Sequence, residues 1–156
     1  MGSGVNFLLK ICTNFSELDF DALCWVYGYD ADDHNKREAL FEYLYDDFFR
    51  TKNSFYAVWV VNGKYVSVAR LEPYCDGYLL EAVETEKGER RKGYARCLLD
   101  AVLRSGRVQI VYAHIYKNNR ASLVLHRSCG FQPHQDYATF IDGTVSANAC
   151  TLKWIK

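Results

Sequence analysis

The sequence predicts one α/β domain with a central mixed, mostly antiparallel sheet of six to seven strands, flanked by about four helices. Three apolar segments separated by tight turns predict an antiparallel meander. The strand–helix–strand succession that follows predicts a crossover connection, which adds a parallel pair to the sheet. The 156 residues suit a single domain over residues 1–156, with residues 1–4 as either a cloning remnant or a disordered segment.

The first half of the chain is predicted to contain one strand, two helices and the meander. The opening strand and the two helices are predicted over residues 5–12, 14–27 and 33–51. The meander strands are predicted over residues 55–61, 65–71 and 78–85. Asn62-Gly63 separates the first two of these strands, and Asp76-Gly77 precedes the third. Asn-Gly favours a hairpin because both residues tolerate a positive φ.

The second half of the chain changes to a helical period. Apolar residues at i, i+3, i+4, i+7 and i+8 predict one buried helix face, formed by Ala95, Leu98, Leu99, Val102 and Leu103. Ser105-Gly106 is expected to end this helix. The remaining predicted elements are a strand over residues 108–115, a helix over 120–128, and two late strands over 137–141 and 145–154 that meet near Asp142-Gly143.

Charge and cysteine content exclude several classes of function. Nineteen Lys and Arg residues balance nineteen Asp and Glu residues, so no basic excess indicates binding to nucleic acid or to an anionic membrane. No apolar run is long enough to span a membrane. Six cysteines without a C-x-x-C pair predict reduced thiols in the cytoplasm, and four histidines without zinc spacing predict no metal. This composition suits a small-molecule or peptide substrate.

The most informative segment is Arg90-Arg91-Lys92-Gly93-Tyr94-Ala95, between a predicted strand and the amphipathic helix. A helix start offers unpaired backbone N–H groups and the positive end of the helix dipole, which together suit a pyrophosphate. Gly93 lets the backbone approach the phosphates, and the three basic residues add positive charge. Neither G-x-x-x-x-G-K-[ST] nor G-x-G-x-x-G is present. The alternative interpretation is a solvated basic helix start with a packing glycine.

Two motifs resemble those of the GNAT acetyltransferase superfamily. The loop fits [RQ]-x-x-G-x-[GA] through Arg90, Gly93 and Ala95. The segment N-R-A-S-L-V-L-H-R-S-C-G-F is similar to the second signature, N-x-x-[AS]-x-x-[LF]-Y-x-x-x-G-F, with matches at Asn119, Ser122, Leu125, Gly130 and Phe131. Asn118 or Asn119 is also expected to cap this helix. The resemblance covers residues 78–131 and implies a GNAT-like sheet in a single acyl-CoA N-acyltransferase domain.

The resemblance implies acetyl-CoA as the co-substrate and transfer of its acetyl group to a primary amine, by direct attack in a ternary complex. It places the pyrophosphate on the loop that contains Arg90, Arg91, Lys92, Gly93, Tyr94, Ala95 and Arg96. It places the pantetheine arm beside Val83, Glu84 and Thr85, and it adds Asn119 to the cofactor site. One departure is that residues 86–89 lack the proline often found before this loop.

The second departure is His126, which stands where the family usually has a tyrosine. The resemblance assigns that position to the acid that protonates the leaving CoA thiolate. An imidazole can also donate a proton near neutral pH, so His126 is a candidate for this role. The alternative is a packed helix histidine, in which case water, Tyr116 or another hydroxyl supplies the proton.

Three residues are candidates for the base that accepts the proton of the amine. Glu81 and Glu84 lie on the strand before the loop, and strand alternation puts them on opposite faces. Glu81 would then share a face with Val83 and Thr85, which makes it the first choice. His114 on the next strand is the rival, with a strand histidine satisfied by its neighbours as the alternative interpretation.

The acceptor site is predicted from the aromatic and acidic residues within residues 27–49. They form either a surface that attracts a cationic amine or the solvated side of an amphipathic helix. A polyamine, an aminoglycoside-like compound, an amino acid and a peptide N-terminus all remain open, as does a homodimer. The competing functions are a non-catalytic acyl-CoA-binding module of the same fold and a structural protein, although the latter leaves both motifs unexplained.

Overall fold

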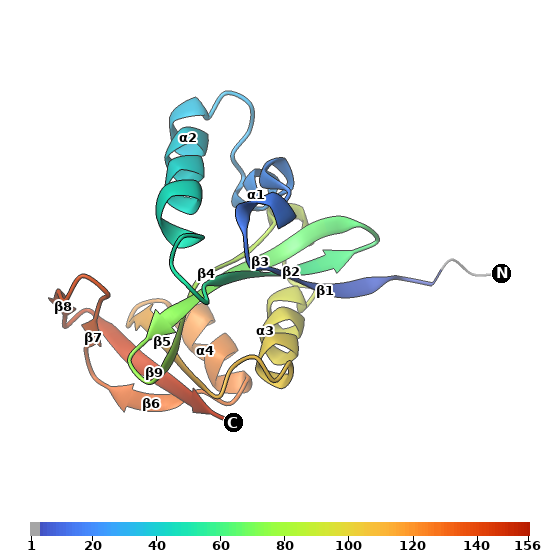
Figure 1. Cartoon of the computed structure of the whole chain (residues 1–156). Helices are drawn as coiled ribbons and strands as arrows, with labels where there is room; N and C mark the ends of the chain where they lie inside the picture. The colour runs from blue at the N-terminus through green and yellow to red at the C-terminus, as the bar shows by residue number, and fades with distance from the viewer. Residues whose placement is uncertain (1–3) are drawn as a thin grey trace.

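The computed structural model describes residues 4–156. The prediction that residues 1–4 are a cloning remnant or disordered therefore lies outside the described residues, except at Gly4. Seven strands form one sheet in the order β1-β2-β3-β4-β5-β9-β6, and β7 pairs separately with β8 (Figure 1). The strands are β1 (Phe7–Cys12), β2 (Phe55–Val61), β3 (Lys64–Tyr74), β4 (Gly77–Thr85), β5 (Ile110–Tyr116), β6 (Gln132–Gln135), β7 (Ala138–Thr139), β8 (Val145–Ser146) and β9 (Ala149–Ile155). Within the described chain only β4 and β5 pair in parallel, which confirms the predicted mixed, mostly antiparallel sheet.

The helices cover both faces of the sheet (Figure 1). They are α1 (Phe20–Tyr27), α2 (His34–Glu42), α3 (Tyr94–Arg104) and α4 (Arg120–Ser128), with shorter helical segments η1 (Phe15–Glu17), η2 (Tyr43–Phe48) and η3 (Lys87–Glu89). The four α-helices confirm the predicted number. None of the helices in residues 4–156 combines the length and apolarity needed to cross a bilayer.

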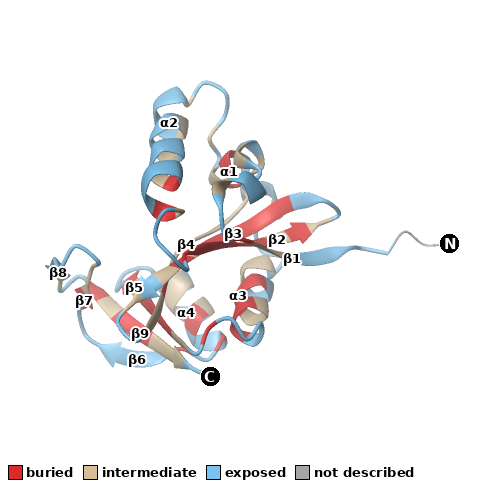
Figure 2. Ribbon diagram, in the orientation of Figure 1, coloured by how far each residue is buried: buried red, intermediate tan, exposed pale blue. Residues whose placement is uncertain are grey.

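Each face of the sheet has its own hydrophobic core, and Figure 2 shows the buried residues on the sheet and on the helix faces turned towards it. Leu98, Leu99 and Val102 of α3 belong to one core, as their helical spacing predicts. The other core joins α1 and η2 to the opposite side of β2 and β3, where Tyr56 and Val58 are fully buried. These two cores hold the middle strands in place, because the strands are covered on both sides.

Both N-terminal helices differ from the prediction. The helix expected over residues 14–27 is broken into η1 and α1, because the Asp19 carboxylate accepts a hydrogen bond from the Ala22 N–H and starts a new helix there. The helix expected over residues 33–51 consists of α2 followed by the π-helical turn η2. In that turn the Phe49 N–H donates to the Leu44 carbonyl at 3.0 Å, a spacing of five residues.

The late strands also differ from the prediction. Residues 137–141 contribute only the two-residue strand β7, and residues 145–154 are divided between β8 and β9. The Asn148 N–H donates to the Ser146 hydroxyl, which turns the chain between β8 and β9. The prediction missed β6, an exposed edge strand that contains Pro133 and so shows no apolar alternation.

Candidate active site

Strands β4 and β5 separate part of the way along the sheet. Their parallel pairing covers only Tyr78 to Leu80 against Val111 to Ala113. Beyond this point β5 pairs only with β9, whereas β4 stays paired with β3 as far as Thr85. A gap therefore opens beside residues 81–85, and the three predicted pantetheine contacts, Val83, Glu84 and Thr85, lie on its edge.

A β-bulge at Ala82 changes the faces on which the two glutamates of β4 lie. Arg70 and Val68, two residues apart on β3, stand opposite Glu81 and Glu84, which are three residues apart. The extra residue is taken up at Ala82, whose φ is +52°. Glu81 and Glu84 consequently face the same side of the sheet, towards α1 and η2. The prediction that strand alternation puts them on opposite faces was wrong, because the bulge inverts the alternation. The prediction that Glu81 shares a face with Val83 and Thr85 was wrong for the same reason, and Val83 packs against the core on the other side.

A cleft of about 510 Å³ lies on this side of the sheet. It brings together two of the candidate bases, Glu81 from β4 and His114 from β5. The turn between β7 and β8 contributes one wall. The lining residues are Tyr43, Glu72, Leu79, Leu80, Glu81, His114, Phe140, Ile141 and Asp142. Glu84 and His126, the other catalytic candidates, are not among them.

The Glu81 carboxyl group is held in an environment that favours its neutral form. Burial is the main cause, the neighbouring Glu72 carboxylate is the second, and together they raise the pKa of Glu81 to about 7. Arg70 opposes this shift, but its Nε lies 3.8 Å from Glu81 Oε1, too far for a hydrogen bond. Both atoms are buried and have no hydrogen-bond partner among the described residues. Glu81 can therefore exchange a proton near neutral pH.

His114 lies between two aromatic rings. Its ring meets those of Tyr74 and Phe140 edge to face, with centroids 5.3 and 5.5 Å apart. Burial lowers the pKa of His114, so its imidazole is neutral at pH 7. Its Nε2 is buried and makes no hydrogen bond within residues 4–156. The side chain thus offers an unused polar atom at the cleft.

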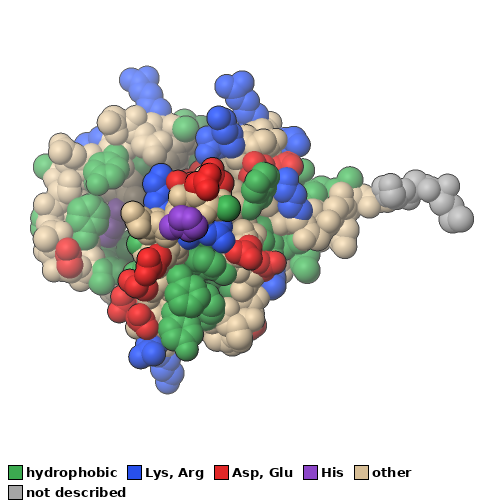
Figure 3. Space-filling model, turned by 90° about the horizontal axis from the view of Figure 1, so that it is seen from above, with side chains coloured by type: hydrophobic (Ala, Val, Ile, Leu, Met, Phe, Trp, Pro, Cys, Tyr) green, Lys and Arg blue, Asp and Glu red, His purple; other side chains and the backbone are tan. Residues whose placement is uncertain are grey.

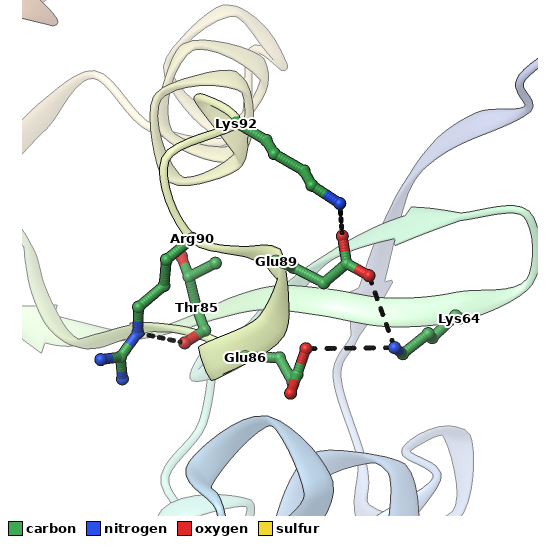
Figure 4. Close-up of polar contacts among 6 residues, drawn as sticks. All are labelled: Lys64, Thr85, Glu86, Glu89, Arg90 and Lys92. Atoms are coloured by element: carbon green, nitrogen blue, oxygen red, sulfur yellow. Dashed lines mark hydrogen bonds and ion pairs between the residues drawn. The ribbon is translucent and has the colours of Figure 1, made fainter.

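Glu84 is tied to the loop that precedes α3. Arg90 donates from its NH2 group to Glu84 Oε1 at 2.9 Å and from Nε to the Thr85 carbonyl at 3.2 Å. Figure 4 shows the Thr85 contact, together with Lys92 bound to Glu89 and Lys64 close to both Glu89 and Glu86. These contacts brace the loop against the ends of β3 and β4.

The same loop presents a run of unpaired backbone donors. Among the described residues, none of the six backbone N–H groups from Arg91 to Arg96 donates to a protein acceptor. Arg91 and Gly93 both have positive φ angles, +66° and +80°, and α3 begins directly after them. Converging N–H groups at a helix start suit a phosphate anion. The loop therefore fits the pyrophosphate that the sequence motif predicts.

His126 is buried in α4, with an exposed fraction of 3%. Its Nδ1 lies 2.7 Å from the Ser122 carbonyl oxygen, and because a carbonyl can only accept, Nδ1 carries the proton. Burial lowers the pKa of His126, so the ring is neutral at pH 7 and its Nε2 is then an acceptor. Asn119 begins the same helix, and its side chain accepts from the Ser122 N–H, which confirms the predicted cap.

The acidic and aromatic residues within 27–49 lie mainly on the outside of the molecule. Figure 3 looks onto the side that α1 and α2 cover, where acidic side chains lie next to hydrophobic ones. The acids of α2 and η2 are exposed: Glu38, Glu42, Asp46 and Asp47. Only Tyr43 of this region lines the cleft. The solvated face is thus the interpretation that fits most of these residues.

Sequence reasoning missed several residues of the cleft. Arg70 and Glu72 continue the alternation of Val66 and Val68 on β3 with charged residues. Charged residues at strand positions that would otherwise be buried could have indicated a functional site. Nothing in the sequence indicated that Asp142 would lie beside β4, because the β7–β8 turn reaches the cleft only through the fold. Within the described residues no group of three or more His, Cys, Asp or Glu side chains is arranged to hold a metal ion.

Comparisons with known proteins agree with this architecture. A family model described as the acetyltransferase (GNAT) family matches residues 19–131. A GNAT-family acetyltransferase from Bacillus cereus ATCC 10987 is similar in structure, with 13% identity, 99% of each chain covered and a TM-score of 0.67. The ribosomal-protein-S18-alanine N-acetyltransferase from Escherichia coli has 17% identity and a TM-score of 0.63, with 95% of this chain and 94% of that chain covered. At these identities the likeness is one of fold, and none of the curated proteins matches the sequence.

Proposed function

Because the chain belongs to the acetyltransferase (GNAT) family, we propose that it transfers the acetyl group of acetyl-CoA to a primary amine by direct attack in a ternary complex. The observation that carries the proposal is the gap between β4 and β5. The loop over residues 90–96, called the phosphate-type loop below, follows the end of β4 at one end of the gap. The cleft that contains Glu81 and His114 lies beside β4 on the other side of Ala82. A cofactor and an acceptor can therefore meet along the same strand.

On the cofactor side, the loop residues hold the pyrophosphate through their backbone N–H groups. Arg91 is exposed and makes no ion pair within residues 4–156, so its guanidinium is free to meet a phosphate. The unpaired edge of β4 provides backbone donors and acceptors for the amides of the pantetheine arm, as in strand addition. The thioester supplies the activated acetyl group.

On the acceptor side, Glu81 is the proposed base. The amine nitrogen forms a bond to the acetyl carbon, the carbon–sulfur bond breaks, and the amine proton passes to the Glu81 carboxylate. A pKa of about 7 suits this task, because the group is substantially ionised at neutral pH yet basic enough to accept a proton. His114 remains the rival base, since its neutral ring lines the same cleft. We also propose a cytoplasmic setting, because six cysteines without a C-x-x-C pair suit reduced thiols.

The proposal is tested by calorimetric titration with acetyl-CoA, followed by release of free CoA thiol with pooled amines. Acetyl-CoA is expected to bind and to raise the melting temperature, because a ligand that binds only the folded state stabilises it. Thiol release with one class of amine would support the transferase. Binding without release for any class would favour the non-catalytic acyl-CoA-binding module, and a lack of binding would contradict both.

We propose that His126 protonates the leaving thiolate, and its contacts restrict how it can do so. With Nδ1–H donated to Ser122, Nε2 can give a proton only from the imidazolium form. His126→Phe keeps a ring of similar size but has no proton to donate. Below pH 6.5 we expect the variant to lose about a hundredfold in kcat, with the Kd for acetyl-CoA changed by about twofold at most.

The pH dependence of kcat distinguishes proton donation by His126 from a purely structural role of its ring. Because burial lowers the pKa of His126 below its ordinary value of 6.5, the imidazolium form becomes more populated as the pH falls and is lost as the pH rises. The ratio of wild-type to variant kcat should therefore decline towards one at alkaline pH. A ratio that stays constant across the pH range would show that His126 acts only through its packing against Phe131.

A further inference from the structure

The acceptor cleft is acidic. Three carboxyl groups line it, those of Glu72, Glu81 and Asp142, and within the described chain no lysine or arginine does. Hydrogen bonds from the Thr144 hydroxyl and N–H lower the pKa of Asp142, so this carboxylate stays ionised. The only histidine of the lining, His114, is neutral because burial lowers its pKa. A carboxylate-bearing acceptor would meet repulsion here, whereas a cation would be attracted.

The pair Glu72 and Glu81 is strained by like charge. The Glu72 carboxylate is the second cause of the raised pKa of Glu81, after burial. Arg70 does not relieve this strain through a hydrogen bond, since its Nε is 3.8 Å from Glu81 Oε1 and its guanidinium is stacked 4.9 Å from the Tyr43 ring centroid. A cation bound beside Glu72 would offset the repulsion between the two carboxylates.

The strand register separates the backbone positions of Glu72 and Glu81 along the cleft. Glu72 stands opposite Leu79, two residues farther from the phosphate-type loop than Glu81. Two residues of strand correspond to about 7 Å. Leu79, Leu80 and Ile141 provide apolar lining, and the rings of Tyr43 and Phe140 can stack on a cation. An occupant with an amine at each end and methylenes in between matches this order of groups.

We propose that the acceptor is an aliphatic diamine or a longer polyamine, an inference that rests on the acyl-transfer function proposed above. One amine lies at Glu81, beside the gap, and is acetylated. The second remains an ammonium ion and binds between Glu72 and Asp142. The neutral amine forms the new nitrogen–carbon bond, its proton passes to Glu81, and the CoA thiolate leaves. The second ammonium takes no part in the chemistry and sets specificity.

The test compares acceptors that share a four-carbon chain and differ only at the far end: 1,4-diaminobutane, butylamine and 4-aminobutyrate. A short peptide beginning with alanine is a fourth acceptor. The expected order of kcat/KM is diamine, then butylamine, then aminobutyrate. The diamine should exceed butylamine about tenfold or more, the effect of one charge-assisted hydrogen bond.

Variants of the cleft connect this preference to its residues. Glu72→Gln and Asp142→Asn keep the size of each side chain and remove one charge, and each should lower the ratio of diamine to butylamine turnover severalfold. Glu38→Gln removes one charge from the exposed side of α2, outside the cleft, and should leave the ratio unchanged. A ratio unchanged in both cleft variants would overturn the inference.

The outcomes distinguish this inference from the function on which it rests. Transfer to butylamine, aminobutyrate or the peptide at least as efficient as transfer to the diamine would overturn the diamine proposal and leave the acetyltransferase standing. If acetyl-CoA binds but none of the acceptors, nor any pooled amine, releases thiol, the proposed function itself fails. Preferential acetylation of the diamine, lost in the cleft variants, would support both.

Discussion

Glu81→Gln is expected to lower kcat/KM for the amine about a hundredfold or more at pH 8, with the Kd for acetyl-CoA changed by about twofold at most. The amide has nearly the size of the carboxyl group but cannot accept the proton of the attacking amine. Because Glu81 lines the acceptor cleft and not the phosphate-type loop, the loss should appear in turnover. Steady-state kinetics and calorimetric titration of the same samples measure the two effects separately.

The pH dependence of the ratio of wild-type to Glu81→Gln rates shows whether the lost group is a base with the pKa of Glu81. A base acts only when ionised, so with a pKa of about 7 the contribution of Glu81 is half-maximal at about pH 7 and levels off at higher pH. The amine itself titrates in the same assay, but its effect cancels in the ratio of wild-type to variant rates. That ratio should therefore rise through about pH 7. Glu72→Gln should move the midpoint downward, because the like charge that raises the pKa is gone.

Two further substitutions test whether Glu81, and not Glu84 or His114, is the base. Glu84→Gln is the matched change on the same face of β4, but Glu84 binds Arg90 of the loop. It should weaken acetyl-CoA binding and leave the pH dependence in place. If Glu81→Gln retained the pH dependence of the wild type and His114→Gln lost it, the base would be His114, whose pKa is lowered.

Gly93→Val is expected to weaken acetyl-CoA binding about a hundredfold, because several hydrogen bonds to a charged phosphate depend on this turn. Gly93 has a φ of +80°, a conformation that a β-branched residue avoids. Its replacement should change the turn and spread the N–H groups that converge before α3. The measurement is the Kd for acetyl-CoA by calorimetry, together with the melting temperature without ligand.

Gly106 provides a matched control at the other end of α3. It has the same φ of +80°, and at both glycines an added Cβ would meet no atom within 4 Å. Gly106→Val therefore introduces the same backbone strain, about 1–2 kcal/mol, far from the loop. Both variants should lose similar stability, but only Gly93→Val should lose affinity. Equal affinity in the two variants would contradict the role of the loop.

The sequence predicted those features that depend on local chemistry. The period of Leu98, Leu99 and Val102 specified the buried face of α3, because helical spacing brings these residues to one side whatever lies opposite. The basic, glycine-containing turn predicted unpaired N–H groups, since the first turn of a helix lacks intrahelical acceptors. Asn119 was recognised as a cap for a similar reason. Together with the meander, these local signals were sufficient for the fold class and for the loop of unpaired N–H groups before α3.

Only the tertiary structure decided how the acceptor side is assembled. The bulge at Ala82 inverts the alternation of side chains along β4. No local sequence pattern predicted it, because a bulge is defined by the register with β3. Asp142 and His114 reach the cleft from β7–β8 and β5, which are distant in sequence from Glu81. Burial, which exists only in the folded chain, then raises the pKa of Glu81 and lowers that of His114. The sequence alone determined the fold class and the loop of unpaired N–H groups before α3 through short-range chemistry. Strand register and burial, which are long-range, determined the charge and shape of the cleft around Glu81 and His114.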